Sequence, residues 1–404
     1  MPTVVLLGTL DTKGKEYDFL RDRVLEHGVE VVLVDTGIMG EPLAEPDITR
    51  EEVAEAVGAD VYVLAAAGDR GAAVETMAEG AAAVVSRLHA EGRLDGILGL
   101  GGSGNSALVT YAMRALPVGV PKLMVSTVAS GDTRPYVGAV DIAMMYSVVD
   151  IAGINRISAQ IMTNAAGMIA GAVTSQVPDL GADRPLIGAS MFGVTTPAVT
   201  TARGRLEELG YEVLVFHATG TGGQSMEALA KGGFLAGLLD VTTTELADEL
   251  VGGVLSAGPD RLEAAGALGL PQVVSLGALD MVNFGPKETV PERFADRNLY
   301  VHNPTITLMR TTAEECLELG RQIGRKLSAA TGPTALFIPL KGVSMIAVEG
   351  QVFHDPEADE ALLQGLHETL GPAVEVHQLE LDINDPAFAT AMADRLHAMI
   401  EDDQ

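Results

Sequence analysis

The sequence predicts an α/β protein built from two Rossmann-like, doubly wound domains with parallel sheets, related by internal duplication, with a ligand cleft between them. Three observations predict this fold class. Short, β-branched and nearly all apolar runs alternate with longer helical patterns along the chain. The alternation restarts after a Pro/Gly/Asp-rich stretch at residues 177–185. The length of 404 residues exceeds that of most domains with a single hydrophobic core, so two domains are expected.

The first domain is expected to span residues 1–181 and to begin with a buried strand. Helical patterns separate the runs, and the first of them ends at Gly28, a residue suited to a helix C-terminus. The uncharged run at 157–173 contains Ser, Gln, Thr and Asn, so it fits a buried helix better than a membrane span. Strands are predicted at "TVVLLG" (3–8), "EVVLVD" (30–35), "VYVLAA" (61–66), "GILGLG" (96–101) and "KLMVS" (122–126).

The second domain, residues 182–404, repeats the layout of the first. An alternative is that the matches reflect only the order of strand, glycine and helix that any two α/β domains share. The continuous register of the matches favours duplication, and the tail at 384–402 is predicted to be a helix that packs on the first domain. The matching segments are "RVLEHGVEVVLVDTG" from Arg23 with "RLEELGYEVLVFHAT" from Arg205, "LDGILGLGGSGNS" from Leu94 with "LAGLLDVTTTELA" from Leu235, and "PKLMVSTVASGD" from Pro121 with "PQVVSLGALD" from Pro271.

The charge and cysteine content of the chain indicate which binding partners and which cellular compartment to expect. The net charge is −29, from 55 acidic and 26 basic residues, which argues against nucleic acid and anionic membranes as partners. Cys316 is the single cysteine, so no intrachain disulfide forms, as is typical of a reducing cytosol. The chain opens on an apolar strand without a basic leader segment, which also favours a cytoplasmic protein. Apolar runs such as "IMTNAAGMIAGAV" favour a homo-oligomer.

The segment "GTLDTKGKE" (8–16) resembles a phosphate-binding loop without being a known one. Five residues separate Gly8 from Gly14, and Glu16 rather than Ser or Thr follows Lys15, so it is not a Walker A loop. It is interpreted as a loop that leads into a helix N-terminus, where an anion is favoured. Asp11 or Thr12 alternatively caps that helix. The candidate nucleotide contacts here are Gly8, Thr9, Asp11, Thr12 and Lys13.

The segment "GLGGSGNS" (99–106) is the stronger candidate for phosphate binding. Glycines at 101, 102 and 104 allow close approach of the backbone to a ligand, and Ser103 and Asn105 can donate hydrogen bonds. A further loop, "STVASGD" (126–132), adds Thr127, Ser130 and Gly131. Three such loops after three parallel strands predict one polar rim that fits a nucleotide, with Asp132 or Asp11 holding Mg²⁺ through water. Asp35, at the end of the second strand, either binds ribose hydroxyls or belongs to a turn.

These segments together make the sequence recognisable. "GTLDTKGKE", "GLGGSGNS", "DIAMMYSVVDIAGINRIS", "MFGVTTP", "FHATGTGG", "TTTELADE", "GALDMVNFG" and "HNPTITLMRTT" resemble an uncharacterised family, the bacterial relatives of the tomato mosaic virus resistance protein with its ATP-binding domain. The resemblance runs from Val4 to about Asp385 and implies ATP bound to the first of two Rossmann-like domains. Its implied nucleotide contacts are Gly8, Thr9, Asp11, Thr12, Lys13, residues 101–105 and residues 127–131. In the plant members a TIM-barrel domain follows; we expect this chain, which ends at Gln404, to lack it and the antiviral role with it.

Polar residues also follow the strands of the second domain. His217 precedes the glycine-rich turn "ATGTGG", which suits a carboxylate or phosphate. His217 is interpreted either as a functional residue of this site or as a core histidine. Arg261 is expected to be a solvated helix charge. No HExxH, CxxC or EF-hand spacing occurs, so no metal site is predicted. The candidate catalytic residues are His217 and His302 as bases, Glu245 and Asp280 as acids or orienting groups, and Arg310 as an anion clamp.

Three functions follow from these patterns. The first is an enzyme that binds ATP on its N-terminal domain, with or without Mg²⁺, and acts on a small anionic metabolite. The second is a non-catalytic binding protein regulated by ATP. The third is a sugar-nucleotide transferase or epimerase of the two-Rossmann type.

Overall fold

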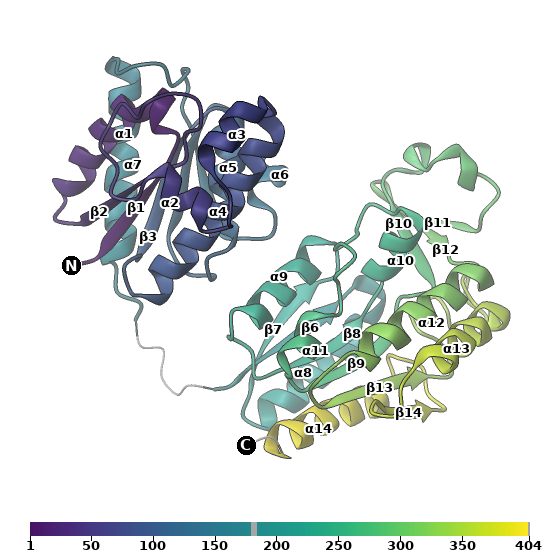
Figure 1. Cartoon of the computed structure of the whole chain (residues 1–404). Helices are drawn as coiled ribbons and strands as arrows, with labels where there is room; N and C mark the ends of the chain where they lie inside the picture. Colours follow the sequence, from purple (N-terminus) through teal and green to yellow (C-terminus); the bar gives the residue numbers. More distant parts are fainter. Residues whose placement is uncertain (179–183, 403–404) are drawn as a thin grey trace. The chain divides into compact units, whose positions relative to one another are not determined.

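The chain folds into two compact units (Figure 1). The structure is a computed structural model that describes residues 1–178 and 184–402. The predicted domain boundary between residues 181 and 182 lies outside the described residues.

The first unit is built on a five-stranded parallel sheet in the order β2-β1-β3-β4-β5. Its strands are β1 (Thr3–Gly8), β2 (Glu30–Asp35), β3 (Gly96–Gly101), β4 (Lys122–Ser126) and β5 (Ile142–Tyr146). Its helices are α1 (Leu10–Leu25), α2 (Arg50–Glu55), α3 (Val61–Ala67), α4 (Arg70–Ala90), α5 (Ser103–Arg114), α6 (Arg134–Val137) and α7 (Arg156–Thr174). The parallel strands predicted from apolar runs are therefore confirmed for β1 to β4.

The two faces of this sheet are covered by different helices. Every residue of β1 and β3 is buried, because alternate side chains pack on opposite layers. Val4 and Leu6 pack with α1 and α7, whereas Val5 and Leu7 pack with α2, α4 and α5. Since α1 follows β1 and α5 follows β3, the chain leaves these neighbouring strands toward opposite faces. The carboxyl ends of β1 and β3 thus form a topological switch point, the usual ligand position in such sheets.

The second unit repeats this topology with one more strand. Its sheet order is β14-β13-β9-β8-β6-β7, and the pairings are parallel. Read from the β7 edge, its first five strands are β7-β6-β8-β9-β13. In both units the edge strand is therefore the second along the chain, followed by the first, third, fourth and fifth, as expected from internal duplication. The strands are β6 (Leu186–Met191), β7 (Glu212–His217), β8 (Gly237–Thr242), β9 (Gln272–Gly277), β13 (Thr334–Pro339) and β14 (Glu375–Leu379).

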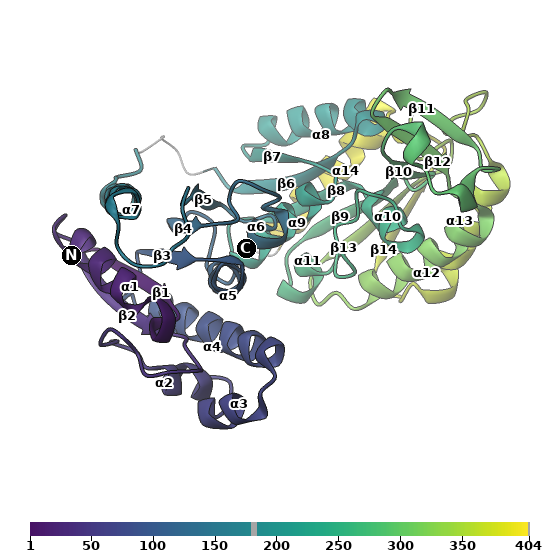
Figure 2. The same ribbon diagram turned by 90° about the horizontal axis from the view of Figure 1, so that it is seen from above.

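Helices cover both faces of the second sheet as well. Figure 2 shows α8 and α14 on one side of the sheet and α11 and α12 on the other. Phe388 and Met392 of α14 are buried with the α8 side chains, so this helix belongs to the second unit, and the prediction that it packs on the first domain is wrong. The helices are η1 (Gly193–Thr195), α8 (Thr196–Glu208), α9 (Thr221–Lys231), α10 (Glu245–Val251), α11 (Ala264–Leu268), η2 (Lys287–Thr289), η3 (Glu292–Phe294), α12 (Ala313–Ser328), α13 (Pro356–Thr369) and α14 (Pro386–Asp402).

Two further elements differ from the prediction. Residues 61–66 form most of helix α3 rather than a strand, because Asp60 accepts hydrogen bonds from Tyr62 and Val63 N–H and caps the helix. Only Val61 of α3 is buried, so this run is not the two-faced core strand that its composition indicated. The second unit also carries an unpredicted antiparallel sheet, β10-β12-β11, made of β10 (Met281–Phe284), β12 (Ile306–Arg310) and β11 (Leu299–Asn303).

Helix α7 agrees with its sequence prediction. Met162, Ala165 and Ile169 are buried on one face of α7, against the first sheet. Across residues 1–178 and 184–402, no helix combines the length and apolarity that crossing a membrane requires.

Candidate functional site

The β1–α1 junction is much tighter than the predicted loop. Thr9 alone separates β1 from α1, so Asp11, Thr12 and Lys13 lie in the first turn of the helix. Asp35 caps this helix from the end of β2, since its Oδ1 accepts the N–H of Leu10 at 2.9 Å. Burial raises the pKa of Asp35. The structure therefore supports the turn interpretation of Asp35 and ties the ends of β1 and β2 together.

The polar side chains in the first turn of α1 are engaged with neighbouring loops. Asp11 Oδ2 accepts the N–H of Met39 at 2.9 Å and of Gly40 at 3.3 Å, and its Oδ1 is buried without a partner among the described residues. Lys13 donates its ammonium to the carbonyl of Ile151. These contacts leave less free charge at this junction than the sequence indicated.

Tyr17 is a central residue that the sequence analysis missed. Its hydroxyl donates to the carbonyl of Leu7 at 2.5 Å and accepts the N–H of Leu100 at 2.9 Å, which joins β1 to β3 beneath the switch point. Burial is the largest cause that raises the pKa of Tyr17. A Cβ on Gly8 would lie 2.0 Å from the Tyr17 oxygen, so this packing requires glycine at position 8.

The first turn of α5 is exposed at the switch point. Gly102 is the N-cap, and no side chain within the described chain caps the helix. The first N–H groups of an α-helix have no partner inside the helix, and Ser103 and Gly104 are exposed here. A Cβ on Gly102 would meet only Thr127 Oγ1, at 3.7 Å. The segment chosen from the sequence as a phosphate loop is thus a helix N-terminus with open space before it.

A cation that the sequence analysis did not select lies beside this helix. A Cβ on Gly104 would lie 3.8 Å from Nη2 of Arg70, the first residue of α4. Arg70 is exposed and makes no hydrogen bond or ion pair within the part of the chain that the structure describes. No sequence pattern identified it, because α4 reaches α5 only through tertiary packing.

The turn after β4 completes the polar edge. Ser126 is buried and its hydroxyl bonds the hydroxyl of Ser106 at 2.6 Å, so it serves the fold. Ser130 and Gly131 are exposed, and Thr127 is half-buried beside Gly102. Asp132 pairs with Arg134 at 2.7 Å, and this neighbour lowers the pKa of Asp132 to about 2.

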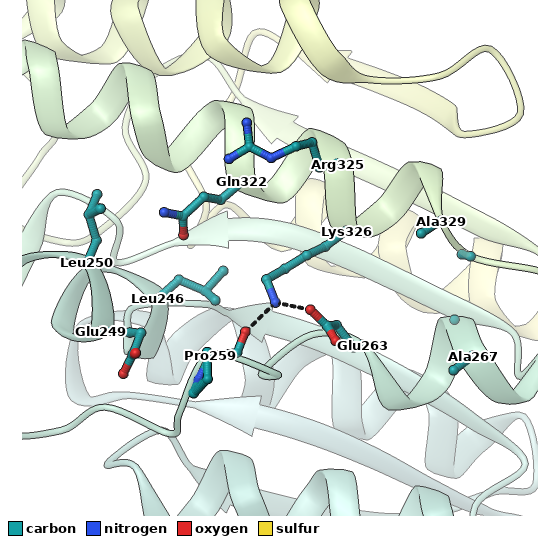
Figure 3. Close-up of a pocket in the computed structure, with 12 residues that line it drawn as sticks. Leu246, Glu249, Leu250, Pro259, Glu263, Ala267, Gln322, Arg325, Lys326 and Ala329 are labelled. Atoms are coloured by element: carbon teal, nitrogen blue, oxygen red, sulfur yellow. Dashed lines mark hydrogen bonds and ion pairs between the residues drawn. The ribbon is translucent and has the colours of Figure 1, made fainter.

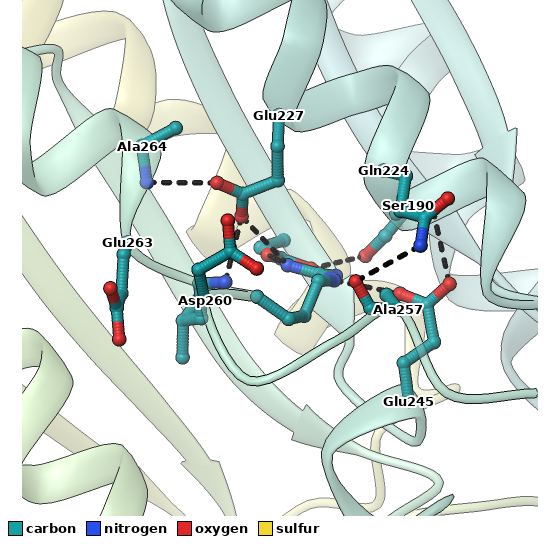
Figure 4. Close-up of polar contacts among 12 residues, drawn as sticks. Ser190, Gln224, Glu227, Glu245, Ala257, Asp260, Glu263 and Ala264 are labelled. Atoms are coloured by element: carbon teal, nitrogen blue, oxygen red, sulfur yellow. Dashed lines mark hydrogen bonds and ion pairs between the residues drawn. The ribbon is translucent and has the colours of Figure 1, made fainter. Parts of the chain in front are cut away.

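In the second unit, Arg261 lies at the centre of a buried ionic cluster, so the prediction of a solvated charge is wrong. It is 1% exposed and contacts Asp240 at 2.5 Å, Glu245 at 2.7 Å and Glu227 at 3.5 Å. Burial raises the pKa of both Glu227 and Glu245, against the lowering effect of the guanidinium. Figure 4 shows the polar contacts of Glu227 and Glu245 in this cluster.

The five candidate catalytic residues do not form one constellation. Glu245 is fully buried against Arg261, while Asp280 accepts the Ser344 hydroxyl at 2.8 Å. Burial raises the pKa of Asp280 to about 6, and the nearby Arg310 opposes the shift. Arg310 binds Asp359 at 2.8 Å. His302 is exposed on β11, and His217 is exposed and stacks on Phe192 at 5.3 Å.

The threonines of "TTTE" have structural partners. Thr242 bonds Thr195 at 2.7 Å, Thr243 donates to the Ser275 carbonyl at 3.1 Å, and Thr244 donates to the Met281 carbonyl at 3.4 Å. All three threonines are fully buried, so their hydroxyls join the end of β8 to the neighbouring elements η1, β9 and β10.

Two cavities in the second unit lie away from its switch point. One, of about 700 Å³, lies between α10, α11 and α12, and its Lys326 pairs with Glu263 (Figure 3). The other, of about 470 Å³, lies at the carboxyl end of β13 and is lined in part by Lys341, His354 and Asp359. Among residues 1–178 and 184–402 no group of three or more His, Cys, Asp or Glu side chains is arranged to hold a metal ion.

Comparison with known proteins identifies the family. The N-terminal domain of an uncharacterised protein family, UPF0261, matches residues 2–178, and the C-terminal domain of the same family matches residues 184–400. The chain belongs to the UPF0261 family. A UPF0261 protein of Clostridium tetani is 55% identical over 399 residues, which cover 98% of this chain and 99% of that protein.

The expected relation to the tomato protein is confirmed. The ToMV resistance protein Tm-1(GCR237) of Solanum lycopersicum is 40% identical over 415 residues, which cover 97% of this UPF0261 chain and 55% of the tomato protein. Among solved structures, a UDP-N-acetylglucosamine 2-epimerase from Rickettsia bellii has a TM-score of 0.24 and 11% identity, with 99% of this chain and 97% of that chain covered. Acinetobacter baumannii MurG has a TM-score of 0.24 and 10% identity, with 99% and 100% covered. Likenesses at this level carry no argument about activity.

Proposed function

We propose that the first unit binds ATP at the carboxyl ends of β1, β3 and β4, with the phosphates at the first turn of α5. The observation that carries the proposal is the exposed helix N-terminus at Gly102–Gly104, which no side chain within the described chain caps and which lies at the switch point. Free amides and the helix dipole favour a phosphate there. Arg70 adds the positive charge that a chain of net charge −29 needs to hold a polyanion.

The residues at this edge fit the phosphates better than they fit a metal. Asp132 is already paired with Arg134, and the described residues contain no three-ligand group. We therefore propose that Mg²⁺ is held by the phosphates and water, because one oxygen of Asp11 accepts the N–H groups of Met39 and Gly40 and the other is buried. A bound Mg²⁺ would neutralise phosphate charge.

Binding is tested by calorimetric titration of the full chain with Mg-ATP. Gly102→Leu places an apolar side chain over the free amides, while the open space around Gly102 allows the fold to form. The matched control is Gly171→Leu on α7, where a Cβ meets nothing within 4 Å. We expect binding by the wild type and the control and none by Gly102→Leu. Equal binding by all three proteins would count against this site.

The use of the nucleotide separates the remaining hypotheses. We propose catalysis on a small anionic metabolite, with ATP-regulated binding of another protein as the alternative. Phosphate or diphosphate release that depends on one member of a panel of carboxylic acids would support the enzyme. Binding of ATP without turnover across the panel would support the regulated binding protein. Competition of UDP-N-acetylglucosamine with ATP would support the sugar-nucleotide enzyme.

A further inference from the structure

The cavity at the carboxyl end of β13 has a largely apolar lining. Its volume of about 470 Å³ is typical of small-molecule sites in proteins. Leu276 of β9, Ile338 of β13 and Leu362 of α13 line it, and all three are buried members of the hydrophobic core of this unit. A hydrocarbon group that enters the cavity therefore meets the core directly and leaves water.

Carboxylates outnumber basic side chains around this cavity. Its lining contains four carboxylates, one lysine and one histidine, which are Glu349, Asp359, Glu360, Glu380, Lys341 and His354. Lys341 pairs with Glu380 at 2.9 Å, so the charge of this lysine is already compensated. The other three carboxylates determine the charge that a ligand meets.

Asp359 is only half satisfied by its partner. Its Oδ1 accepts Nη2 of Arg310 at 2.8 Å, whereas its Oδ2 accepts no hydrogen bond within the described chain. Burial raises the pKa of Asp359, against the lowering effect of Arg310. The ionised carboxylate would therefore be stabilised by a second cation.

Glu349 and Glu360 lie at the exposed rim of the cavity. Their side chains make no hydrogen bond or ion pair in the part of the chain that the structure describes. The rim is therefore negatively charged, which attracts a cation and disfavours the small anionic metabolite of the proposed function.

An organic cation fits this cavity better than a metal ion. Among the residues described, no three His, Cys, Asp or Glu side chains are arranged to hold a metal, and a metal ion would leave the apolar lining without a contact. The cavity between α10, α11 and α12 differs in charge, because two carboxylates and two cations balance in its lining: Glu249, Glu263, Arg325 and Lys326.

We propose that the cavity at the carboxyl end of β13 binds an ammonium ion that carries an apolar body. Asp359 holds the ammonium group, and the hydrocarbon part contacts Leu276 and Ile338. The exposed Glu349 and Glu360 attract the cation to the cavity. The site belongs to the second unit and does not depend on ATP binding by the first.

The test is calorimetric titration of the full chain at physiological salt with three ligands of one length: n-hexylammonium, hexan-1-ol and hexanoate. We expect one saturable hexylammonium site per chain, about tenfold tighter than for hexan-1-ol, and no binding of hexanoate. Shorter alkylammonium ions are expected to bind about fourfold more weakly for each methylene removed. Equal affinity for hexanoate, or affinity that does not change with chain length, would overturn the inference.

Paired variants locate the site. Glu349→Gln combined with Glu360→Gln is expected to weaken hexylammonium binding about fivefold. The matched control is Glu288→Gln combined with Glu357→Gln, which removes the same charge from two exposed, unpaired glutamates of this unit that do not line the cavity. Equal losses in the two pairs would mean general attraction to an acidic protein and would overturn the proposed site.

A single variant separates ammonium binding from support of the fold. Asp359→Asn is expected to weaken hexylammonium binding about tenfold and to leave hexan-1-ol binding within about twofold of wild type. A parallel loss for both ligands would show that Asp359 only supports the cavity. Absence of hexylammonium binding by the wild type would refute this inference alone, because the ATP titration of the first unit is a separate measurement.

Discussion

Replacing Arg70 by alanine tests the proposed phosphate site at a cation that has no partner within the described residues. The guanidinium lies next to the exposed start of α5 and makes no ion pair within the described chain, so all of its charge is available to a ligand. A hydrogen bond to a charged group contributes about 1.5–3 kcal/mol, which corresponds to about a 10- to 150-fold change in Kd. Because Arg70 is exposed, we expect a loss of about 10-fold in ATP affinity.

The same substitution is expected to leave stability almost unchanged. An exposed residue without partners changes the free energy of unfolding by about 0.5 kcal/mol or less. The control is Arg87→Ala, which lies exposed in the last turn of the same helix, about 25 Å away along its axis. Titration calorimetry at low and at physiological salt measures the effect, which should shrink as salt screens the charge. Affinity within twofold of wild type for Arg70→Ala would refute the proposed role of this residue.

Three predictions concern stability. Tyr17→Phe removes the hydroxyl that joins β1 to β3 and is expected to lower the free energy of unfolding in urea by about 1–3 kcal/mol; a neutral result would contradict its bridging role. Arg261→Met leaves Asp240, Glu227 and Glu245 buried without their cation and is expected to cost about 3–5 kcal/mol, which a loss below 1 kcal/mol would disprove. Burial raises the pKa of Asp280 to about 6, above its unfolded value near 4, so its contribution to stability is present at low pH and declines as pH rises from about 4 to 6. Urea unfolding across this range should show a shallower decline for Asp280→Asn than for the wild type, and parallel curves would exclude Asp280 as the cause.

Much of the fold was predictable from local pattern. The strands β1, β3, β4, β8 and β9 are short runs buried on both faces, and that burial is what removes the usual alternation of polar residues. The duplication was visible because residues 94–106 and 235–247 keep one register through a strand and into a helix. Residues 61–66 were misassigned because a short apolar run does not distinguish a strand from a helix, and a cap from Asp60 decided the outcome.

The candidate site was predictable only in part. Glycines at 101, 102 and 104 marked the exposed start of α5, since glycine spacing is a local property. Arg70 was not predictable, because it approaches Gly104 from a separate helix. The burial of Arg261 was equally hidden, since its partners Glu227, Asp240 and Glu245 are distributed over three elements.

The amino-acid sequence by itself determined the two-domain α/β class, the family and the glycine-rich segment after β3, because hydrophobic period and glycine placement act over a few neighbouring residues. Only the tertiary structure decided which charged side chains are exposed and which are buried. Arg70 lies exposed beside Gly104, and Arg261 lies buried against Glu245, because elements that are distant in the sequence pack around them.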